Sequence, residues 1–182
     1  IRGALNKMLT LTAEEAARGV ATVSSGNHGS SVSYAASLLG IQNAKVIVPE
    51  GTPQSKIDRI RYFGAEVLQM GKSYDEAHRL GLDYIRRHGL TYIDAYYDDP
   101  KSYGGQGTIG IELLEQNPDI DTIVVPIGGG LITGIAVAAK ALKPDIRIAE
   151  LLTRLQMEFE RSREPWEVLT RAPNEPAIQL AL

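Results

Sequence analysis

Short apolar segments rich in β-branched residues alternate with helical segments along most of the chain. The segments that predict strands comprise residues 19–24, 44–48, 65–68, 92–93, 122–125 and 146–148. The segments that predict helices comprise residues 30–39, 55–63, 74–88, 107–115 and 131–142. Strands that alternate with helices indicate βαβ units and a mostly parallel sheet. We therefore predict an α/β fold with ligand sites at the carboxyl ends of its strands.

The alternation ends near residue 149, and the last part of the chain has a different pattern. Leu151, Leu152, Leu155 and Phe159 have the spacing of one helical face. The prolines that follow are typical of loops. We expect residues 149–182 to add a helix and a loop to the fold.

The composition of the 182 residues restricts the class of protein. A formal net charge of −3 and dispersed cationic residues provide no basic surface for nucleic acid. The apolar runs are too short to span a bilayer, and Arg2, Asn6 and Lys7 interrupt any signal peptide. Because the chain has no cysteine, which agrees with a reducing compartment, we expect a cytoplasmic protein without nucleic-acid or membrane partners. Because the sequence opens with Ile1 rather than methionine, we expect that its start is missing.

Residues 24–29, Ser-Ser-Gly-Asn-His-Gly, lie between a predicted strand and a predicted helix. Gly26 allows backbone conformations that a side chain would forbid, and the helix that follows offers unpaired N–H groups to an anion. The Ser25 hydroxyl and the Asn27 amide can both donate and accept hydrogen bonds. The loop therefore predicts a site for a carboxylate or a phosphate. The alternative is a plain turn in which the asparagine or a serine caps the helix.

A second glycine-rich loop, residues 126–131, also joins a predicted strand to a predicted helix. Gly128, Gly129 and Gly130 allow backbone N–H groups to surround an anion, and the dipole of the helix that Leu131 opens adds to the attraction. Because the loop lacks the Gly-Lys-Ser/Thr end of a P-loop, hydrolysis of nucleoside triphosphates is not expected. The alternative is that these glycines only permit close packing of the helix on the sheet.

A dinucleotide site is a competing interpretation of the second loop. Gly128, Gly130 and Gly134 follow a strand, and Glu150 lies 22 residues after Gly128, at the end of the next strand. A dinucleotide-binding fold places its ribose-binding acid near that distance. The glycine spacing departs from G-x-G-x-x-G, however, and this interpretation leaves residues 24–29 without a role.

Together with residues 105–108 (Gly-Gln-Gly-Thr), the two loops resemble those of the fold-type II pyridoxal-phosphate enzymes, whose two-domain, three-layer fold is tryptophan synthase β-like. The branch that they resemble is that of the threonine/serine dehydratases (ammonia-lyases) and serine racemase. Residues 2–4 (Arg-Gly-Ala) are similar to the end of that family's S-F-K-x-R-G-A segment, whose lysine forms the Schiff base with the cofactor. The resemblance thus implies that this lysine immediately precedes Ile1. It covers residues 1–148, and the second loop has three glycines where the family usually has four.

The resemblance also implies roles for the residues of both loops. The residues expected to bind pyridoxal 5'-phosphate are Asn27, Gly128, Gly129, Gly130 and Leu131. The residues expected to contact the amino-acid substrate are Ser24, Ser25, Gly26, Asn27 and His28. Asn27 would hydrogen-bond the ring hydroxyl of the cofactor, and the second loop would hold its phosphate through backbone N–H groups. Ser25 would act as a catalytic residue near the substrate Cα, and His28 would mainly shape the turn.

The reaction that the resemblance implies is α,β-elimination of L-threonine or L-serine to a 2-oxo acid and ammonia, catalysed by a lyase of amino-acid metabolism. Racemisation of serine, threonine synthesis and β-replacement are related alternatives. A non-catalytic protein that binds a phosphate or a dinucleotide is an alternative of a different class. No metal ligand is assigned, because Asp98 and Asp99 before Pro100 are typical of a solvated turn.

The resemblance further implies how the chain is divided. Residues 1–16 and 94–148 are expected in a large cofactor-binding domain, and residues 17–93 in a small mobile domain that closes on the substrate. The assignment of residues 149–182 stays open, and a helix and a loop of the large domain are the assignment considered. A homodimer or homotetramer is expected.

Overall fold

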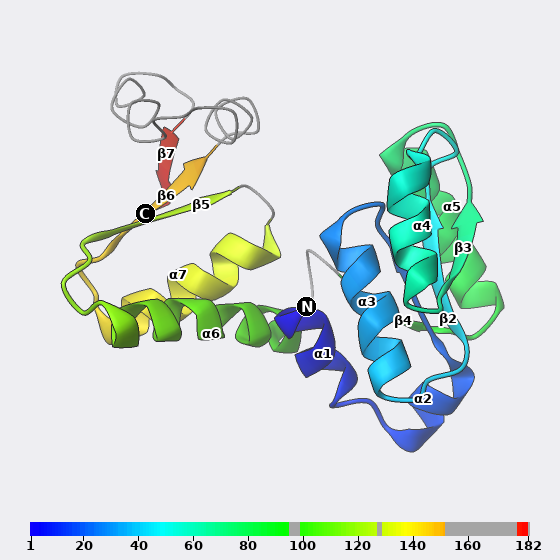
Figure 1. Cartoon of the computed structure of the whole chain (residues 1–182), viewed down its shortest axis with the longest axis horizontal. Helices are drawn as coiled ribbons and strands as arrows, with labels where there is room; N and C mark the ends of the chain where they lie inside the picture. Colours follow the sequence, from blue (N-terminus) through cyan, green and yellow to red (C-terminus); the bar gives the residue numbers. More distant parts are fainter. Residues whose placement is uncertain (95–98, 127–128, 152–177, 182) are drawn as a thin grey trace. The chain divides into compact units, whose positions relative to one another are not determined.

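The computed structural model describes residues 1–94, 99–126, 129–151 and 178–181 of the chain. They belong to two compact units, unit 1 (Ile1–Gly105) and unit 2 (Gln106–Leu182), and each unit has its own sheet (Figure 1). Within the described ranges, no helix is both long enough and apolar enough to cross a membrane.

Unit 1 contains a sheet whose strands are all parallel and lie in the order β3-β2-β1-β4. Its elements are α1 (Arg2–Met8), α2 (Ala13–Arg18), β1 (Val20–Val23), α3 (Asn27–Leu38), β2 (Ala44–Val48), α4 (Gln54–Tyr62), β3 (Glu66–Gln69), α5 (Tyr74–Arg87), β4 (Thr91–Tyr92) and the first part of α6 (Pro100–Gln116). The chain moves outward from β1 to β3 and then returns to the other side of β1 as β4. The carboxyl end of β1 therefore borders the topological switch point of this sheet, where open α/β sheets bind ligands.

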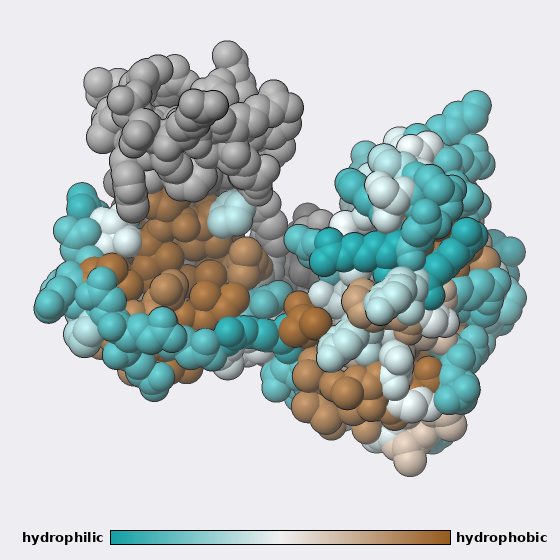
Figure 2. Space-filling view, viewed as in Figure 1, coloured by the Kyte–Doolittle hydropathy of each residue, from teal (hydrophilic) through white to brown (hydrophobic). Residues whose placement is uncertain are grey.

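Helices cover both faces of this sheet (Figure 1). Val20 and Val46 belong to a cluster that the sheet forms with α1, α3 and α4. Ala21 and Ile47 point to the opposite face, where they pack with Ala77 of α5. The central strands β1 and β2 are thus buried on both sides of a parallel sheet, and unit 1 has three layers. The outer surface of α4 is mostly hydrophilic (Figure 2).

In unit 2, β5 (Thr122–Pro126) and β6 (Arg147–Leu151) are parallel, and β7 (Ile178–Ala181) pairs antiparallel with β6. α7 (Gly130–Leu142) connects β5 to β6. The core joins Ile123 and Ile148 of the strands to Ile135 of α7. α6 and α7 approach closely, because a Cβ atom on Gly107 would lie only 3.0 Å from the carbonyl oxygen of Gly134.

The strands predicted up to residue 148 are confirmed with small shifts of their ends, and so is the mostly parallel arrangement. Two helices start earlier than predicted: α3 at Asn27 instead of residue 30, and α6 at Pro100 instead of residue 107. The short helices α1 and α2 were not predicted. α2 carries a signal that the periodicity missed, a capping box in which the side chains of Thr12 and Glu15 bond each other's backbone N–H groups.

Two predictions for the last part of the chain are wrong. The strand at 146–148 is not the last, because β7 pairs with β6. Leu151 does not begin a helical face, since β6 continues to that residue. Leu152, Leu155 and Phe159 lie outside the described residues.

The prediction of a solvated turn at the two aspartates is wrong for Asp99. Its carboxylate lies 2.6 Å from Lys7 Nζ, its side chain is 14% exposed, and it also accepts the N–H of Lys101 at the start of α6. Asp98 lies outside the described residues.

Candidate active site

The junction between β1 and α3 lies at the switch point of the unit 1 sheet. Ser24 continues the pairing of β1 by donating its N–H to the carbonyl oxygen of Ile47 in β2 (3.0 Å). α3 then begins at Asn27, with Gly26 as its N-cap residue. Asn27 and His28 are therefore in the first turn of the helix, whereas the sequence had predicted them in the preceding loop.

Two contacts make this junction tight. The Ser24 hydroxyl accepts the N–H of Gly26 (3.2 Å), and the Ser24 side chain is nearly buried. A Cβ atom on Gly29 would lie 2.2 Å from the carbonyl oxygen of Ser24, so only glycine fits there. The start of α3 is therefore packed directly on the end of β1.

The first turn of α3 lacks a side-chain cap. Gly26 provides no cap hydrogen bond, and no acidic residue lies in the first turn. The alternative in which asparagine or serine caps the helix is therefore wrong. The first N–H groups of a helix have no partner within it, and here they lie at the carboxyl end of a parallel strand. The side chains of Ser25 and Asn27 make no hydrogen bond within the described part of the chain, so both are available to a ligand.

His28 connects the helix to the end of β4, the second neighbour of β1 in the sheet. Its Nε2 lies 3.1 Å from the carbonyl oxygen of Ile93, the residue that follows β4. Because a carbonyl only accepts, this ring nitrogen carries the hydrogen. Burial lowers the pKa of His28, while the bond to Ile93 and the charge of Asp94 partly oppose that effect. The ring is therefore held as a neutral donor.

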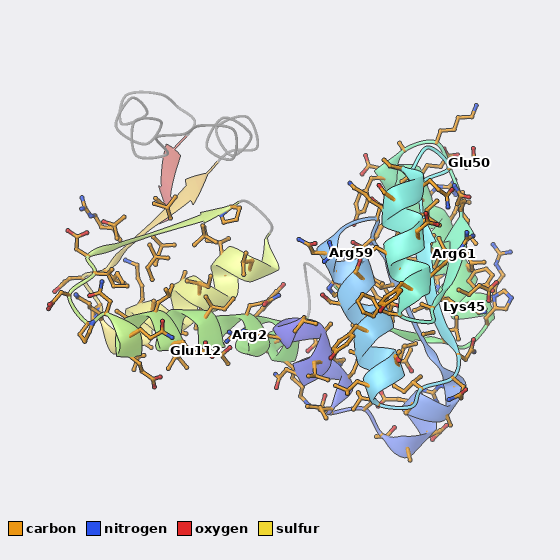
Figure 3. All side chains as sticks on the ribbon, in the orientation of Figure 1. Arg2, Lys45, Glu50, Arg59, Arg61 and Glu112 are labelled. Atoms are coloured by element: carbon orange, nitrogen blue, oxygen red, sulfur yellow. The ribbon has the colours of Figure 1, made fainter. Side chains whose placement is uncertain are left out.

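A pocket of about 280 Å³ adjoins the first turns of α3. Its lining residues are Ile1, Asn27, Ser30, Ser31, Tyr34, Arg59 and Phe63. The Ser31 hydroxyl donates to the carbonyl oxygen of Asn27 (2.7 Å), and the rings of Tyr34 and Phe63 meet edge to face with centroids 5.2 Å apart. Arg59, on α4, lies beside the first turns of α3 and supplies the positive charge of the pocket (Figure 3).

The sequence analysis did not single out the residues that share this pocket with Asn27. One signal was present, because Ser30, Ser31 and Tyr34 follow Asn27 by three, four and seven positions. Those positions lie on one face of a helix. Arg59 comes from another helix, and no spacing in the sequence connects it to this face.

The second glycine-rich loop precedes α7 in unit 2. Gly129 is the N-cap residue and has a φ of 55°, in the left-handed region that favours glycine. The first turn, Gly130 and Leu131 included, has neither a side-chain cap nor an acidic residue, so its N–H groups suit an anion. Gly128 lies outside the described residues. The carbonyl oxygen of Gly134 lies close to Gly107 of α6, so this part of α7 packs against another helix.

The candidate site residues thus lie at the starts of two helices, α3 in unit 1 and α7 in unit 2, each after a parallel strand. The described ranges contain no group of three or more His, Asp or Glu side chains that could hold a metal ion.

Comparison with known proteins identifies the family. The model of the family described as "Pyridoxal-phosphate dependent enzyme" matches residues 1–166. L-Threonine ammonia-lyase of Thermotoga maritima is 41% identical over 154 residues, which are 84% of this chain and 38% of the relative. Serine racemase of Arabidopsis thaliana is 46% identical over 148 residues, 81% of this chain and 44% of the relative.

A solved structure agrees with these relatives. The processed form of threonine deaminase isoform 2 from Solanum lycopersicum aligns with a TM-score of 0.77 and 42% identity, over 83% of this chain and 44% of that one. The chain spans less than half the length of each of these three proteins. Since the family model covers most of the sequence and the fold agrees with a solved structure of 42% identity, the chain belongs to the family of pyridoxal-phosphate-dependent enzymes.

Proposed function

We propose that the protein containing this chain is a pyridoxal-phosphate-dependent lyase that converts L-threonine or L-serine into a 2-oxo acid and ammonia. The observation that carries the proposal is the junction at residues 24–29. There an uncapped helix and two polar side chains without a partner among the described residues meet at the switch point. The identity of 41% to an L-threonine ammonia-lyase supports this reaction.

The residues of both junctions fit the chemistry of the cofactor. The uncapped first turn of α7, after Gly129 in its left-handed conformation, would hold the phosphate through N–H groups of Gly128, Gly129, Gly130 and Leu131. Asn27 would bond the ring hydroxyl, because its amide has no other partner within the described residues. Bound pyridoxal phosphate supplies the electron sink that makes loss of the substrate's α-proton feasible.

The residues of the β1–α3 junction would bind and orient the amino acid. The free N–H groups at the start of α3 suit its carboxylate, with Gly26 close by and Ser24 shaping the turn. The Ser25 hydroxyl would lie near the substrate Cα, where it can hold a proton or pass it on. The lysine before Ile1 remains a prediction, which the position of Ile1 in the same pocket as Asn27 supports.

Racemisation of serine is the second candidate. The serine racemase of Arabidopsis thaliana is 46% identical to the chain, and this identity favours a racemase as much as the first comparison favours a lyase. Both reactions begin with removal of the α-proton. They differ in whether the β-hydroxyl leaves or a proton returns to the opposite face.

One assay separates the two candidates. The full-length protein, loaded with pyridoxal phosphate, is incubated with L-threonine or L-serine while ammonia, 2-oxo acid and both serine enantiomers are measured. We expect ammonia and 2-oxo acid in equal amounts. Formation of D-serine with little ammonia would replace the proposal by racemisation, and absence of both products would refute both.

Replacing Asn27 by alanine is expected to weaken binding of pyridoxal phosphate about tenfold, since a hydrogen bond in a site contributes roughly 1 kcal/mol or more. The free energy of unfolding should stay within about 0.5 kcal/mol, because the side chain is exposed and has no hydrogen-bond partner among the residues that the structure describes. Titration of the cofactor-free protein followed by absorbance measures the affinity. Asn117→Ala is the matched control, an exposed asparagine beyond the end of α6. Equal affinity in Asn27→Ala and wild type would remove Asn27 from the cofactor site.

The proposal also covers the division of the chain into domains, its oligomeric state and its location. We propose that residues 1–16 and 94–148 form part of the large domain and residues 17–93 the small one. Strands β1 to β4 all lie within residues 17–93, and the compact unit that contains them also includes residues 1–16 and 94–105. We also propose a homo-oligomer that acts on small amino acids. A location in the cytoplasm agrees with the absence of cysteine.

A further inference from the structure

The start of α3 is held between the two neighbours of β1. On one side, Ser24 donates its N–H to Ile47 of β2. On the other side, His28 reaches Ile93 at the end of β4, 65 residues further along the chain. These two contacts straddle the switch point, so together they fix the position of the junction relative to both halves of the sheet.

The contact of His28 has a rigid acceptor. Ile93 is fully buried, and its own N–H donates to the carbonyl oxygen of Ala21 in β1 (2.8 Å). Its carbonyl group therefore has a fixed direction. A side chain that is bonded to this carbonyl is therefore fixed relative to β1 and β4.

Few other bonds restrain the first turn. No side chain caps the helix, and the first backbone bond of the turn, from Ser30 N–H to the Gly26 carbonyl, is long at 3.3 Å. The Ser31 hydroxyl bonds only within the turn, to the carbonyl of Asn27. Among the described residues, His28 thus provides the side-chain hydrogen bond from this turn to the sheet.

We propose that His28 is a positioning residue: its bond to Ile93 holds the first turn of α3 in the orientation in which Asn27 and Ser25 meet pyridoxal phosphate. This inference rests on the proposed function for the identity of the ligand. His28 acts through its neighbours in the first turn, because its own Nε2 is bonded to the Ile93 carbonyl.

Two amide substitutions separate the hydrogen bond from the rest of the ring. In His28→Gln, the side-chain amide nitrogen can reach the place of Nε2 and donate to Ile93. In His28→Asn, the amide nitrogen corresponds to Nδ1 and is too short to reach that carbonyl. His88→Asn is the control, since His88 also bonds a backbone carbonyl, that of Tyr84, but within α5 and its C-cap.

The full-length protein and these three variants are compared in two measurements: the dissociation constant of pyridoxal phosphate, and hydrogen exchange of the amides of residues 27–31 without cofactor. In His28→Asn we expect about five- to tenfold weaker binding and faster exchange, the effect of one lost hydrogen bond. His28→Gln should stay within about threefold of wild type, and His88→Asn should not differ from it.

The two measurements also separate this inference from the proposed function. If wild-type protein binds no pyridoxal phosphate, the proposed function fails. If, in addition, the hydrogen-exchange rates of residues 27–31 are unchanged in His28→Asn, the proposed role of the bond between His28 and Ile93 is overturned as well. If wild type binds the cofactor and His28→Asn binds it equally well, the inference alone is overturned. Equal losses of cofactor affinity in His28→Gln and His28→Asn would overturn it too, because the imidazole ring itself and not the hydrogen bond would then be required.

Discussion

Replacing Gly29 by alanine is expected to lower the free energy of unfolding by about 3 kcal/mol, the upper part of the range for overpacked cores. The new Cβ atom would lie 2.2 Å from the Ser24 carbonyl oxygen and 3.0 Å from Val46 Cγ1. The N–H of Ser24 is bonded to Ile47 in β2, so the residue that carries this oxygen is fixed to the sheet. α3 would have to move off the sheet, and the helical preference of alanine, about 1 kcal/mol, is too small to offset this.

The displaced helix carries Asn27, so the same variant should bind pyridoxal phosphate at least about tenfold more weakly. Chemical denaturation followed by circular dichroism measures the first effect, and titration with the cofactor measures the second. Gly51→Ala is the matched control in the same unit, because a Cβ atom on Gly51 meets nothing within 4 Å. If Gly29→Ala were as stable as Gly51→Ala, the close packing of α3 on β1 would be wrong.

The succession of strands and helices along the chain could be predicted because the central strands bury apolar residues on both faces of the sheet. Val20 and Ala21 of β1 contact helices on opposite faces of the sheet, and so do Val46 and Ile47 of β2, so these two strands are short segments rich in β-branched residues. Such segments are visible in the sequence without knowledge of the fold. The early start of α3 could not be predicted, because asparagine, histidine and glycine at residues 27–29 are poor helix formers. The contacts of His28 and Gly29 with the sheet outweigh that preference.

The early start of α6 was hidden in a similar way. Its first turns contain Gly104 and Gly105, which weaken a helical pattern, whereas Pro100 in first position is a usual start signal. Gly105 is required by a tertiary contact, which the local sequence does not reveal.

The candidate site was predicted in part. Its two loops are local, contiguous and rich in glycine, so the sequence shows them directly. Arg59 and Phe63 reach the pocket only because α4 packs beside α3. Only the structure shows that the Asn27 side chain has no partner in the described part of the chain, since the same residue could have capped the helix.

Gly105→Ala is the second substitution with a large expected effect. A Cβ atom there would lie 2.5 Å from the carbonyl oxygen of Arg2 and 2.7 Å from Gly3 Cα, both backbone atoms of α1. α1 is further held to the start of α6 by Lys7 and Asp99 (2.6 Å) and by the Asn6 amide, which donates to the Lys101 carbonyl (2.6 Å). These bonds resist a displacement of α1, so the clash must strain one of the two helices.

The neighbouring glycine provides the control. Gly104 is exposed, and a Cβ atom on it would meet only Asn6 Nδ2, at 3.7 Å. Both substitutions gain the helical preference of alanine, about 1 kcal/mol. Gly104→Ala should therefore be neutral or more stable than wild type, while Gly105→Ala should lose about 2 kcal/mol after that gain. Denaturant titrations of both variants, run side by side, measure the difference.

The pair of variants also tests the link between packing and the proposed site. Ile1, directly before α1, lines the same pocket as Asn27. If α1 shifts in Gly105→Ala, that wall of the pocket shifts with it, and we expect about tenfold weaker binding of pyridoxal phosphate, with Gly104→Ala unchanged. Loss of stability with normal cofactor binding would separate α1 from the cofactor site. Equal stability of the two variants would contradict the close contact between α1 and α6 itself.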